Sequence, residues 1–268
     1  MFTNRVQTKS YLHDDLSFLV PTNEIDQMPV ELQELCEQYN SECRENVDEQ
    51  DAVATSDWPV SLFVPNQYEQ NYAYPLLIWF HDEHSSENEL DLVMSAIGDQ
   101  NYCGLALRGN HQLTGHDSFG WDNGALEFSH VPLKRLVNIT ARRLRRAFHI
   151  HSERIFVAGS GTGGDTALRL FSESPEWFAG AIVIDPTCRE QLTLGNHSEM
   201  RGKNVLHTVS RTASNEMLAG NLDTVRLLRS AGVEVDVRVT EEPLDPCCND
   251  ARFIDNWLLS RLNCEAYV

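Results

Sequence analysis

The 268-residue sequence lacks any long hydrophobic run, and this argues against the commonest kind of membrane protein. No stretch approaches the roughly 20 consecutive apolar residues that a membrane-spanning helix needs. The opening residues, MFTNRVQTKSYLHDDL, also lack the apolar segment of a secretory signal. We therefore expect a cytoplasmic protein.

Paired cysteines are also missing. The chain has seven cysteines, an odd number, and none of them shows the Cys-x-x-Cys spacing of many metal and redox sites. This usage is typical of reduced thiols in a cytoplasmic protein. The neighbouring Cys247 and Cys248 could form a redox pair, but buried or idle thiols are the favoured interpretation.

Positive charge is scarce: 21 Lys and Arg face 40 Asp and Glu, a net charge of −19 at pH 7. Nucleic acids and anionic membranes would repel such a chain, so neither is expected as a partner. Residues 1–57 alone hold 13 acidic and three basic residues. We expect them to form an acidic N-terminal extension, with one amphipathic helix over residues 30–39 and a solvated remainder, before a domain over residues 58–268.

From residue 58 onward, short apolar runs alternate with helical patterns. Five runs are typical of strands buried on both faces of a parallel sheet: residues 76–80, 103–107, 154–158, 181–184 and 204–209. Helical spacing appears at residues 132–148, 165–174, 215–230 and 250–262. Residues 233–239 alternate strictly, which predicts an edge strand with one solvated face. This order predicts an α/β fold, a doubly wound and mainly parallel sheet between two helical layers.

The segment RIFVAGSGTGGDTALRLF (154–171) is a strand that ends in glycines and runs directly into a helix. In a nucleophile elbow, G-x-S-x-G, such a turn presents a nucleophile, and the flanking glycines avoid collisions with neighbouring backbone. In a dinucleotide site, G-x-G-x-x-G, the bare backbone approaches a pyrophosphate. Gly159, Gly161 and Gly164 fit the second pattern, and Asp185 follows where a ribose-binding acid would lie. Several strands precede this turn, whereas a dinucleotide turn usually opens its sheet, so we favour the elbow.

Residues 59–262 as a whole resemble the phospholipase/carboxylesterase and dienelactone-hydrolase-like branch of the α/β-hydrolase superfamily. YPLLIWFHDEH (74–84) resembles the family's strand leading into the oxyanion loop, and RIFVAGSGTGGDTALRL resembles its elbow. SPEWFAGAIVIDP (174–186) is similar to the segment that follows the elbow. The resemblance covers about three quarters of the chain. It implies an α/β-hydrolase fold and, in the family, a serine hydrolase that cleaves carboxylic esters without a cofactor.

The nucleophile implied by this resemblance is absent. The matching position is Gly161, which offers no side-chain oxygen or sulfur. Asp82 stands where the family favours glycine in the oxyanion loop, and a carboxylate there would repel a developing oxyanion. Thr162 follows the nucleophile position, and its backbone N–H is expected to survive as an anion-binding donor.

The acid and the base are absent from their expected places as well. After residues 204–209, the stretch SRTASNE offers only Glu216, inside a helix that Ser214 or Asn215 would cap. No histidine follows His207, so the loop after residues 233–239 has no base. A serine hydrolase without a base cannot deprotonate its nucleophile.

We therefore expect a catalytically inactive hydrolase-fold protein that acts as a binding or interaction module. Its degenerate pocket is expected around His81, Asp82, Gly161, Thr162 and Trp121. One alternative is a weak ester hydrolase with a displaced triad: Ser160, Asp185 and His207. Another is a nucleotide-binding protein that uses the turn over residues 159–164. His207 lies inside an apolar strand, and an elbow centred on Ser160 would have Ala158 and Thr162 at the two positions where the pattern needs glycine. Structural roles are therefore favoured for both.

A metal-dependent hydrolase is a further alternative. HDEH (81–84) is rich in ligand-forming side chains, and His111, His116 and Asp117 lie in the loop after the next strand. The carboxyl ends of parallel strands could bring these loops together. None of the spacings is a known zinc signature, so we expect no metal and no other cofactor.

Two more segments have features that could serve a function. A basic cluster lies on the helix before the glycine turn: Arg142, Arg143, Arg145 and Arg146. A solvated helix face is the favoured interpretation, ahead of a docking surface for an acidic partner such as the N-terminal extension. The loop over residues 108–124 is long and contains Phe119 and Trp121, and we expect any retained ligand to bind there.

Overall fold

The computed structural model of the chain describes residues 10–11, 58–115, 117–121, 127–128, 131–188, 192–195, 197–248 and 251–264. Apart from Ser10 and Tyr11, the expected acidic extension and its helix over residues 30–39 lie outside the described residues. No helix in the described part of the chain is long and apolar enough to cross a membrane.

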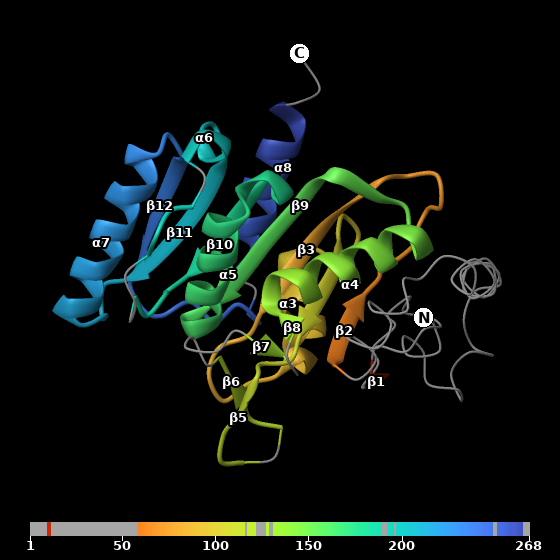
Figure 1. The fold of residues 1–268 in the computed structure, drawn as a ribbon, viewed down its shortest axis with the longest axis horizontal. Helices are drawn as coiled ribbons and strands as arrows, with labels where there is room; N and C mark the ends of the chain where they lie inside the picture. Colours follow the sequence, from red (N-terminus) through yellow and green to blue (C-terminus); the bar gives the residue numbers. More distant parts are fainter. Residues whose placement is uncertain are drawn as a thin grey trace.

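An eight-stranded sheet forms the centre of the molecule, with the strand order β1-β2-β4-β3-β9-β10-β11-β12 (Figure 1). Its strands are β1 (Ser10–Tyr11), β2 (Pro59–Phe63), β3 (Tyr74–Phe80), β4 (Cys103–Leu107), β9 (Ile150–Ser160), β10 (Gly180–Ile184), β11 (Asn204–Ser210) and β12 (Glu234–Thr240). The sheet is parallel from β4 to β12, while β2 runs antiparallel to β4 and β1 antiparallel to β2. The carboxyl ends of six neighbouring strands therefore meet at one edge.

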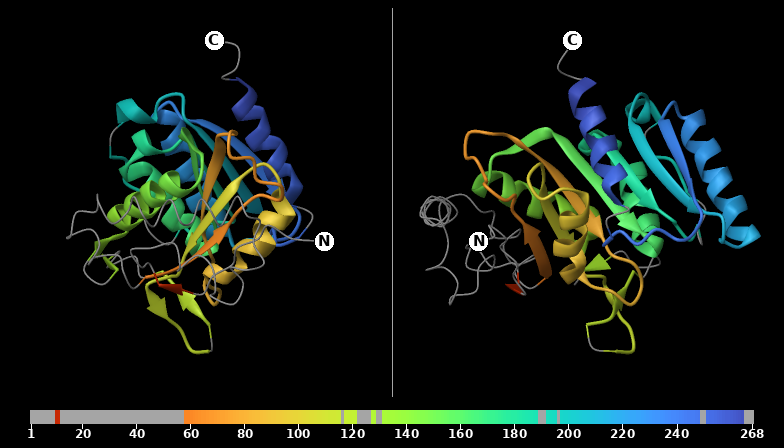
Figure 2. Two further views of the ribbon diagram at one scale, coloured as in Figure 1. Left: turned by 90° about the vertical axis from the view of Figure 1, so that its right-hand side faces the viewer. Right: turned by 180° about the vertical axis from the view of Figure 1, so that it is seen from behind.

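Helices cover both faces of this sheet. One face carries α4 (Leu133–Ala147), α5 (Gly161–Glu173) and α7 (Asn215–Ser230). The other face carries α3 (Leu90–Ile97) and α8 (Arg252–Cys264), as the two views of Figure 2 show. Short elements complete the described chain: η3 (Glu87–Glu89), β5 (His111–Gln112), β6 (Phe119–Gly120), β7 (Glu127–Phe128), β8 (Val131–Pro132), η4 (Pro175–Trp177) and α6 (His197–Met200).

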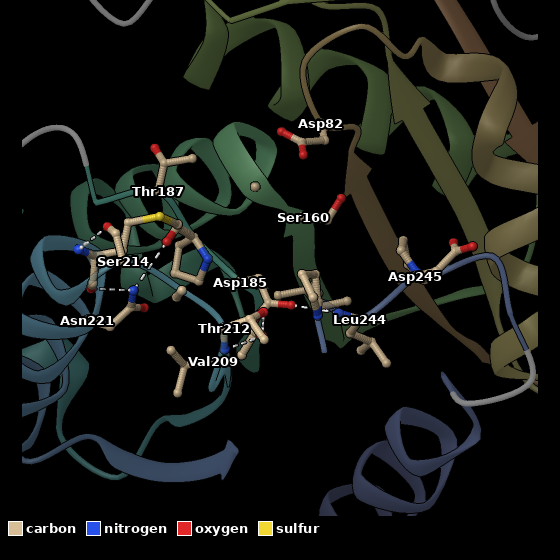
Figure 3. A pocket seen from close by; sticks show the side chains of 18 of the residues that line it. Asp82, Ser160, Asp185, Thr187, Val209, Thr212, Ser214, Asn221, Leu244 and Asp245 are labelled. Atoms are coloured by element: carbon tan, nitrogen blue, oxygen red, sulfur yellow. Dashed lines mark hydrogen bonds between the residues drawn. The ribbon is translucent and has the colours of Figure 1, made fainter. Parts of the chain in front are cut away.

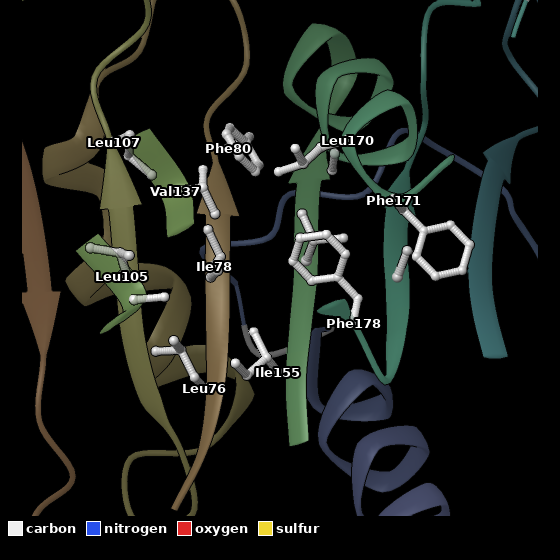
Figure 4. Packing of buried hydrophobic residues seen from close by; sticks show 14 of the residues in the cluster. Leu76, Ile78, Phe80, Leu105, Leu107, Val137, Ile155, Leu170, Phe171 and Phe178 are labelled. Carbon is white, nitrogen blue, oxygen red and sulfur yellow. The ribbon is translucent and has the colours of Figure 1, made fainter. Parts of the chain in front are cut away.

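The apolar composition of the central strands explains this three-layer arrangement. All seven residues of β3 are buried, because helices shield the strand on both faces. Ile78 and Phe80 pack towards α4 and α5, together with Val137 and Leu170 (Figure 4). Trp79 belongs to the opposite cluster, under α3 and α8.

The expected α/β fold with a mainly parallel sheet is confirmed. The five apolar runs form β4, β3, β9, β10 and β11, and these strands are neighbours in the sheet. The expected bounds of α5 were wrong, since the helix begins at Gly161 rather than at residue 165. Glycines weaken the helical pattern over those four residues, although tertiary packing holds them in the helix.

The edge position of β12 is also confirmed, but its expected buried face is only partly present. Val235 is buried, whereas Val237 is 43% exposed and Val239 is 56% exposed. The apolar alternation therefore overstated how far α7 covers the strand. Several elements had no counterpart in the sequence-based expectation, β2 and α3 among them. They are short, and periodicity identifies short elements poorly.

Candidate functional site

A pocket of about 470 Å³ opens at the carboxyl ends of the parallel strands. Its wall comes from residues after β3, β9, β10, β11 and β12, and Figure 3 shows Asp82, Ser160, Asp185 and Asp245 at its border. Ligands of α/β sheets usually bind at this edge, and the volume lies within the ordinary range of small-molecule sites. This pocket is the candidate functional site.

The turn between β9 and α5 has the geometry of a nucleophile elbow. Gly161 adopts a left-handed φ of +52° at the first position of the helix. A Cβ on Gly159 would lie 2.4 Å from the carbonyl oxygen of Gly163, and one on Gly163 would lie 2.2 Å from that of Phe80. Both flanking glycines are therefore required by close backbone contacts, as the elbow interpretation of the sequence predicts.

The side chain of Asp82 occupies the space that an elbow nucleophile would need. Strand register explains its position: Phe80 pairs with Gly159, so the residues just after the two strands lie next to each other. A Cβ on Gly161 would lie only 2.0 Å from Asp82 Oδ1. Glycine at this position is thus the only residue compatible with the observed position of Asp82.

Asp82 also takes the backbone donors that a hydrolase uses to bind an oxyanion. Its Oδ1 accepts hydrogen bonds from the Thr162 backbone N–H at 2.9 Å and from the Glu83 backbone N–H at 2.7 Å. In the α/β-hydrolase elbow, the oxyanion hole consists of the N–H after the nucleophile and an N–H from the loop after the third strand. The Thr162 N–H is still a donor to an anion, as expected, but that anion is the internal carboxylate of Asp82.

The positions expected for the acid and the base have other roles. Ser214 caps α7 by accepting a hydrogen bond from the Met217 N–H at 3.2 Å, so Glu216 lies in the first turn of the helix, as expected. In the loop after β12, the Leu244 N–H donates to Asp185 Oδ2 at 2.8 Å. Burial raises the pKa of Asp185 above its ordinary value.

Of the displaced triad, the structure brings two members to the pocket. Ser160 pairs with Ile184, the residue before Asp185, across β9 and β10, and both Ser160 and Asp185 line the cavity. His207 is fully buried in the middle of β11 and does not line the cavity. Its Nε2 lies 2.6 Å from Oδ1 of Asn221 on α7, and burial lowers its pKa.

The five residues expected at the degenerate pocket divide into two groups. Asp82 and Gly161 line the cavity, and Thr162 bonds to Asp82 from behind. His81 and Trp121 are buried in the core instead. His81 Nε2 accepts from the Gly109 N–H at 2.9 Å, so its Nδ1 carries the proton that it donates to the Asp82 carbonyl oxygen at 2.7 Å.

The two loops considered for a metal do meet, through backbone contacts. The Phe119 N–H donates to the Ser85 carbonyl oxygen, and the His84 N–H donates to the Phe119 carbonyl oxygen. Within the described residues, no group of three or more His, Cys, Asp or Glu side chains could hold a metal ion. His111 is exposed on β5, and His116 lies outside the described residues. Described residues of the loop over 108–124 do not line the candidate pocket, contrary to expectation.

Sequence reasoning missed two further carboxylates of the pocket, Glu89 and Asp245. Glu89 accepts hydrogen bonds from Trp79 Nε1 at 2.6 Å and from the Ser85 hydroxyl. Burial raises its pKa, and the charges of Asp82 and Asp245 raise it further. Glu89 ends the short helix η3 and Asp245 lies in the loop after β12. Both segments are polar, and one more carboxylate there gives no signal in a single sequence.

The basic cluster lies at a second cavity, far from the first along the strands. Arg142, Arg145 and Arg146 line it together with His149 and His151, just before and at the start of β9. Arg143 faces the interior instead and is buried, so the expectation of a fully solvated cluster was wrong for this residue.

No protein-family model and no curated protein sequence matches the chain. Solved structures do match it. A carboxylesterase from Bacillus cereus gives a TM-score of 0.58 at 17% identity, covering 76% of this chain and 94% of that one. A ferulic acid esterase gives 0.58 at 15% identity, covering 78% and 95%. A carboxylesterase from Mesorhizobium loti gives 0.55 at 20% identity, covering 75% and 94%. At such identities the likeness establishes the fold, and the chain has the α/β-hydrolase fold.

Proposed function

We propose that this α/β-hydrolase-fold protein does not hydrolyse esters and serves as a binding module, with the pocket at the carboxyl ends of the strands as its ligand site. The observation that carries the proposal is the position of Asp82. Its carboxylate excludes any side chain at Gly161 and takes both backbone donors of the oxyanion hole. One residue thus removes both the nucleophile and the electrostatic stabilisation of the transition state.

The same carboxylate argues against nucleotide binding at the glycine turn. A pyrophosphate would need the N–H groups at the N-terminus of α5. Asp82 already binds the Thr162 N–H there, and its negative charge would repel a phosphate.

A weak ester hydrolase remains the second candidate, and one observation favours it. The Ser160 hydroxyl reaches the pocket and forms no hydrogen bond with a described residue, so it is available to a substrate. Against this candidate, His207 is bonded to Asn221 and lies away from the cavity, which leaves Ser160 without a base.

The cellular setting forms part of the proposal. The four cysteines in the described part of the chain, Cys103, Cys188, Cys247 and Cys248, form no disulfide with one another, and the proposed setting is a reducing compartment such as the cytoplasm. The net charge of −19 supports a partner other than nucleic acid or an anionic membrane.

Turnover of p-nitrophenyl acetate and labelling by a fluorophosphonate probe test the proposal. We expect the protein to hydrolyse the ester no faster than its Ser160→Ala variant, and we expect no labelling, because the probe needs an activated serine. Stoichiometric labelling that disappears in Ser160→Ala would overturn the proposal and establish the displaced serine as a nucleophile.

A further inference from the structure

The candidate pocket carries a strongly one-sided charge. Four carboxylates are among its 20 lining residues: Asp82, Glu89, Asp185 and Asp245. Among the described residues that line the cavity, none is a Lys, Arg or His. The acids come from different segments of the chain, after β3, in η3, after β10 and after β12, and the fold brings them to one cavity.

A buried hydroxyl without a partner provides an independent sign of a ligand. Ser160 is only 8% exposed, yet its side chain lines the cavity and forms no hydrogen bond with a described residue. Buried polar groups are usually hydrogen-bonded, so an unpaired one at a cavity wall is a place for a ligand's polar group. A serine hydroxyl can accept a hydrogen bond as well as donate one.

One of the carboxylates has an oxygen available to a ligand. The three hydrogen bonds to the Asp82 side chain all end on Oδ1, which leaves Oδ2 for a ligand. Asp185 Oδ2 accepts the Leu244 N–H, and its Oδ1 is buried, so Asp185 contributes negative charge to the cavity rather than a free oxygen. The free acceptors around the cavity are therefore one carboxylate oxygen and one hydroxyl.

Apolar side chains complete the wall of the pocket. Ile184, Val209, Met217 and Leu244 line it alongside the polar groups. A ligand that fills the cavity would bury apolar atoms against them, and burial of apolar surface favours binding.

We propose that the pocket binds a small organic amine: a protonated primary amino group held by Ser160 and Asp82 and attracted by the charge of Asp185, on an apolar body that contacts the aliphatic wall. An ammonium group carries three N–H donors and no acceptor, which suits a wall that offers free acceptors and negative charge. This assignment rests on the proposed role as a binding module. In a hydrolase of this fold the corresponding backbone donors bind a negatively charged oxygen. In this chain the Asp82 carboxylate takes those donors, so the site favours a cation instead.

The electrostatic state of the empty pocket supports this assignment. Burial raises the pKa of both Glu89 and Asp185, and the negative charges of Asp82 and Asp245 raise that of Glu89 further. A bound cation would offset this repulsion between carboxylates, whereas a bound anion would increase it.

Isothermal titration calorimetry with the full chain tests the proposal. The probes are butylamine, 3-phenylpropylamine and cadaverine, each compared with its alcohol counterpart and, for the first two, with the matching carboxylic acid. We expect at least one amine to bind about 10-fold or more tightly than its alcohol, since each hydrogen bond to a charged group changes Kd by about 10- to 100-fold. The carboxylates should not bind.

Three variants localise the binding. Asp82→Asn and Asp185→Asn each keep an oxygen acceptor for the neighbouring N–H groups and remove one charge, and each should weaken the amine by about 10-fold or more. Glu153→Gln removes the same charge from an exposed residue of β9 outside the pocket and should leave Kd unchanged. If Asp82→Asn does not fold, Asp185→Asn alone decides the question.

Each outcome bears on the proposal. Equal affinity for amines and alcohols, equal losses in Glu153→Gln and Asp185→Asn, or no binding across the whole amine panel would overturn it. Ester hydrolysis is measured separately, so failure of the proposed function and failure of amine binding are distinguishable.

Discussion

At the residue scale, Gly161 and Asp82 depend on each other. Gly161 has a left-handed φ of +52°, and a Cβ added there would lie 2.0 Å from Asp82 Oδ1. Gly202 also has a left-handed φ, +76°, but a Cβ there would meet nothing within 4 Å. Substitutions at the two glycines therefore distinguish the cost of backbone strain from the cost of collision with the carboxylate.

We expect Gly161→Ala to reduce the free energy of unfolding by about 3 kcal/mol, because it combines left-handed strain with displacement of Asp82 from its two donors. Gly202→Ala should lose only the backbone part, about 1–2 kcal/mol. In an Asp82→Ala background, the Gly161→Ala loss should fall to the Gly202→Ala value. A double-mutant cycle by urea denaturation measures this coupling. If the losses in the free energy of unfolding were additive, the Asp82 side chain would not be what excludes a side chain at position 161.

At the scale of elements, α7 is attached to the sheet by a buried polar pair. His207 on β11 and Asn221 on α7 are both buried, with 2.6 Å between Nε2 and Oδ1. The amide of Asn221 also donates to the carbonyl oxygens of Met217 and, beyond the helix, Pro186. This pair therefore joins the helix to β11 and to the loop after β10, which forms part of the pocket wall.

Asn221→Leu should reduce the free energy of unfolding by about 2 kcal/mol, because it leaves the ring of His207 and the Pro186 carbonyl without their partner. Adding His207→Leu should recover part of the loss, since replacing both members removes the unpaired group. Asn215→Leu, the same change at the exposed first residue of α7, should stay within about 0.5 kcal/mol. Thermal or urea unfolding measures all three. An equal loss in the double variant would contradict a role for the pair.

The elements themselves were largely predictable from the sequence, and the site was predictable only in part. Short continuous apolar runs identified β3, β9 and β11, because burial on both faces leaves few polar residues. The glycines of the elbow were readable because each avoids a specific backbone collision. The position of the Asp82 carboxylate could not be predicted from the sequence, since it depends on the register between β3 and β9. Glu89 and Asp245 join the pocket only through tertiary folding, which periodicity does not encode.

At the scale of the whole molecule, catalysis in this fold would need side chains from three separate loops at the same edge of the sheet. The nucleophile follows β9, and the resemblance to hydrolases places the acid after β11 and the base after β12. In this chain the first place is Gly161, the second leads into the cap of α7, and the third has no histidine. The amine-binding residues proposed above come from the same edge of the sheet. The loops that would carry a catalytic triad in a hydrolase therefore carry hydrogen-bond acceptors for a cation in this chain.

Opening the elbow should therefore not create an efficient enzyme. We expect Asp82→Gly with Gly161→Ser to free the oxyanion donors and to add a hydroxyl, yet to turn over p-nitrophenyl acetate at least ~10³-fold more slowly than a complete triad, because triad members act as a unit. Steady-state kinetics give this rate, and Asp82→Gly alone is the control for background hydrolysis. The contrary result would be a fast burst of p-nitrophenol in the double variant only, followed by a turnover rate that increases with pH around neutrality. That result would mean that a histidine acts as the general base for the new serine. His81 bonds to Gly109, the ring of His84 contacts the Ser118 hydroxyl, and His207 bonds to Asn221, so each of these histidines would have to leave its present partner to do so.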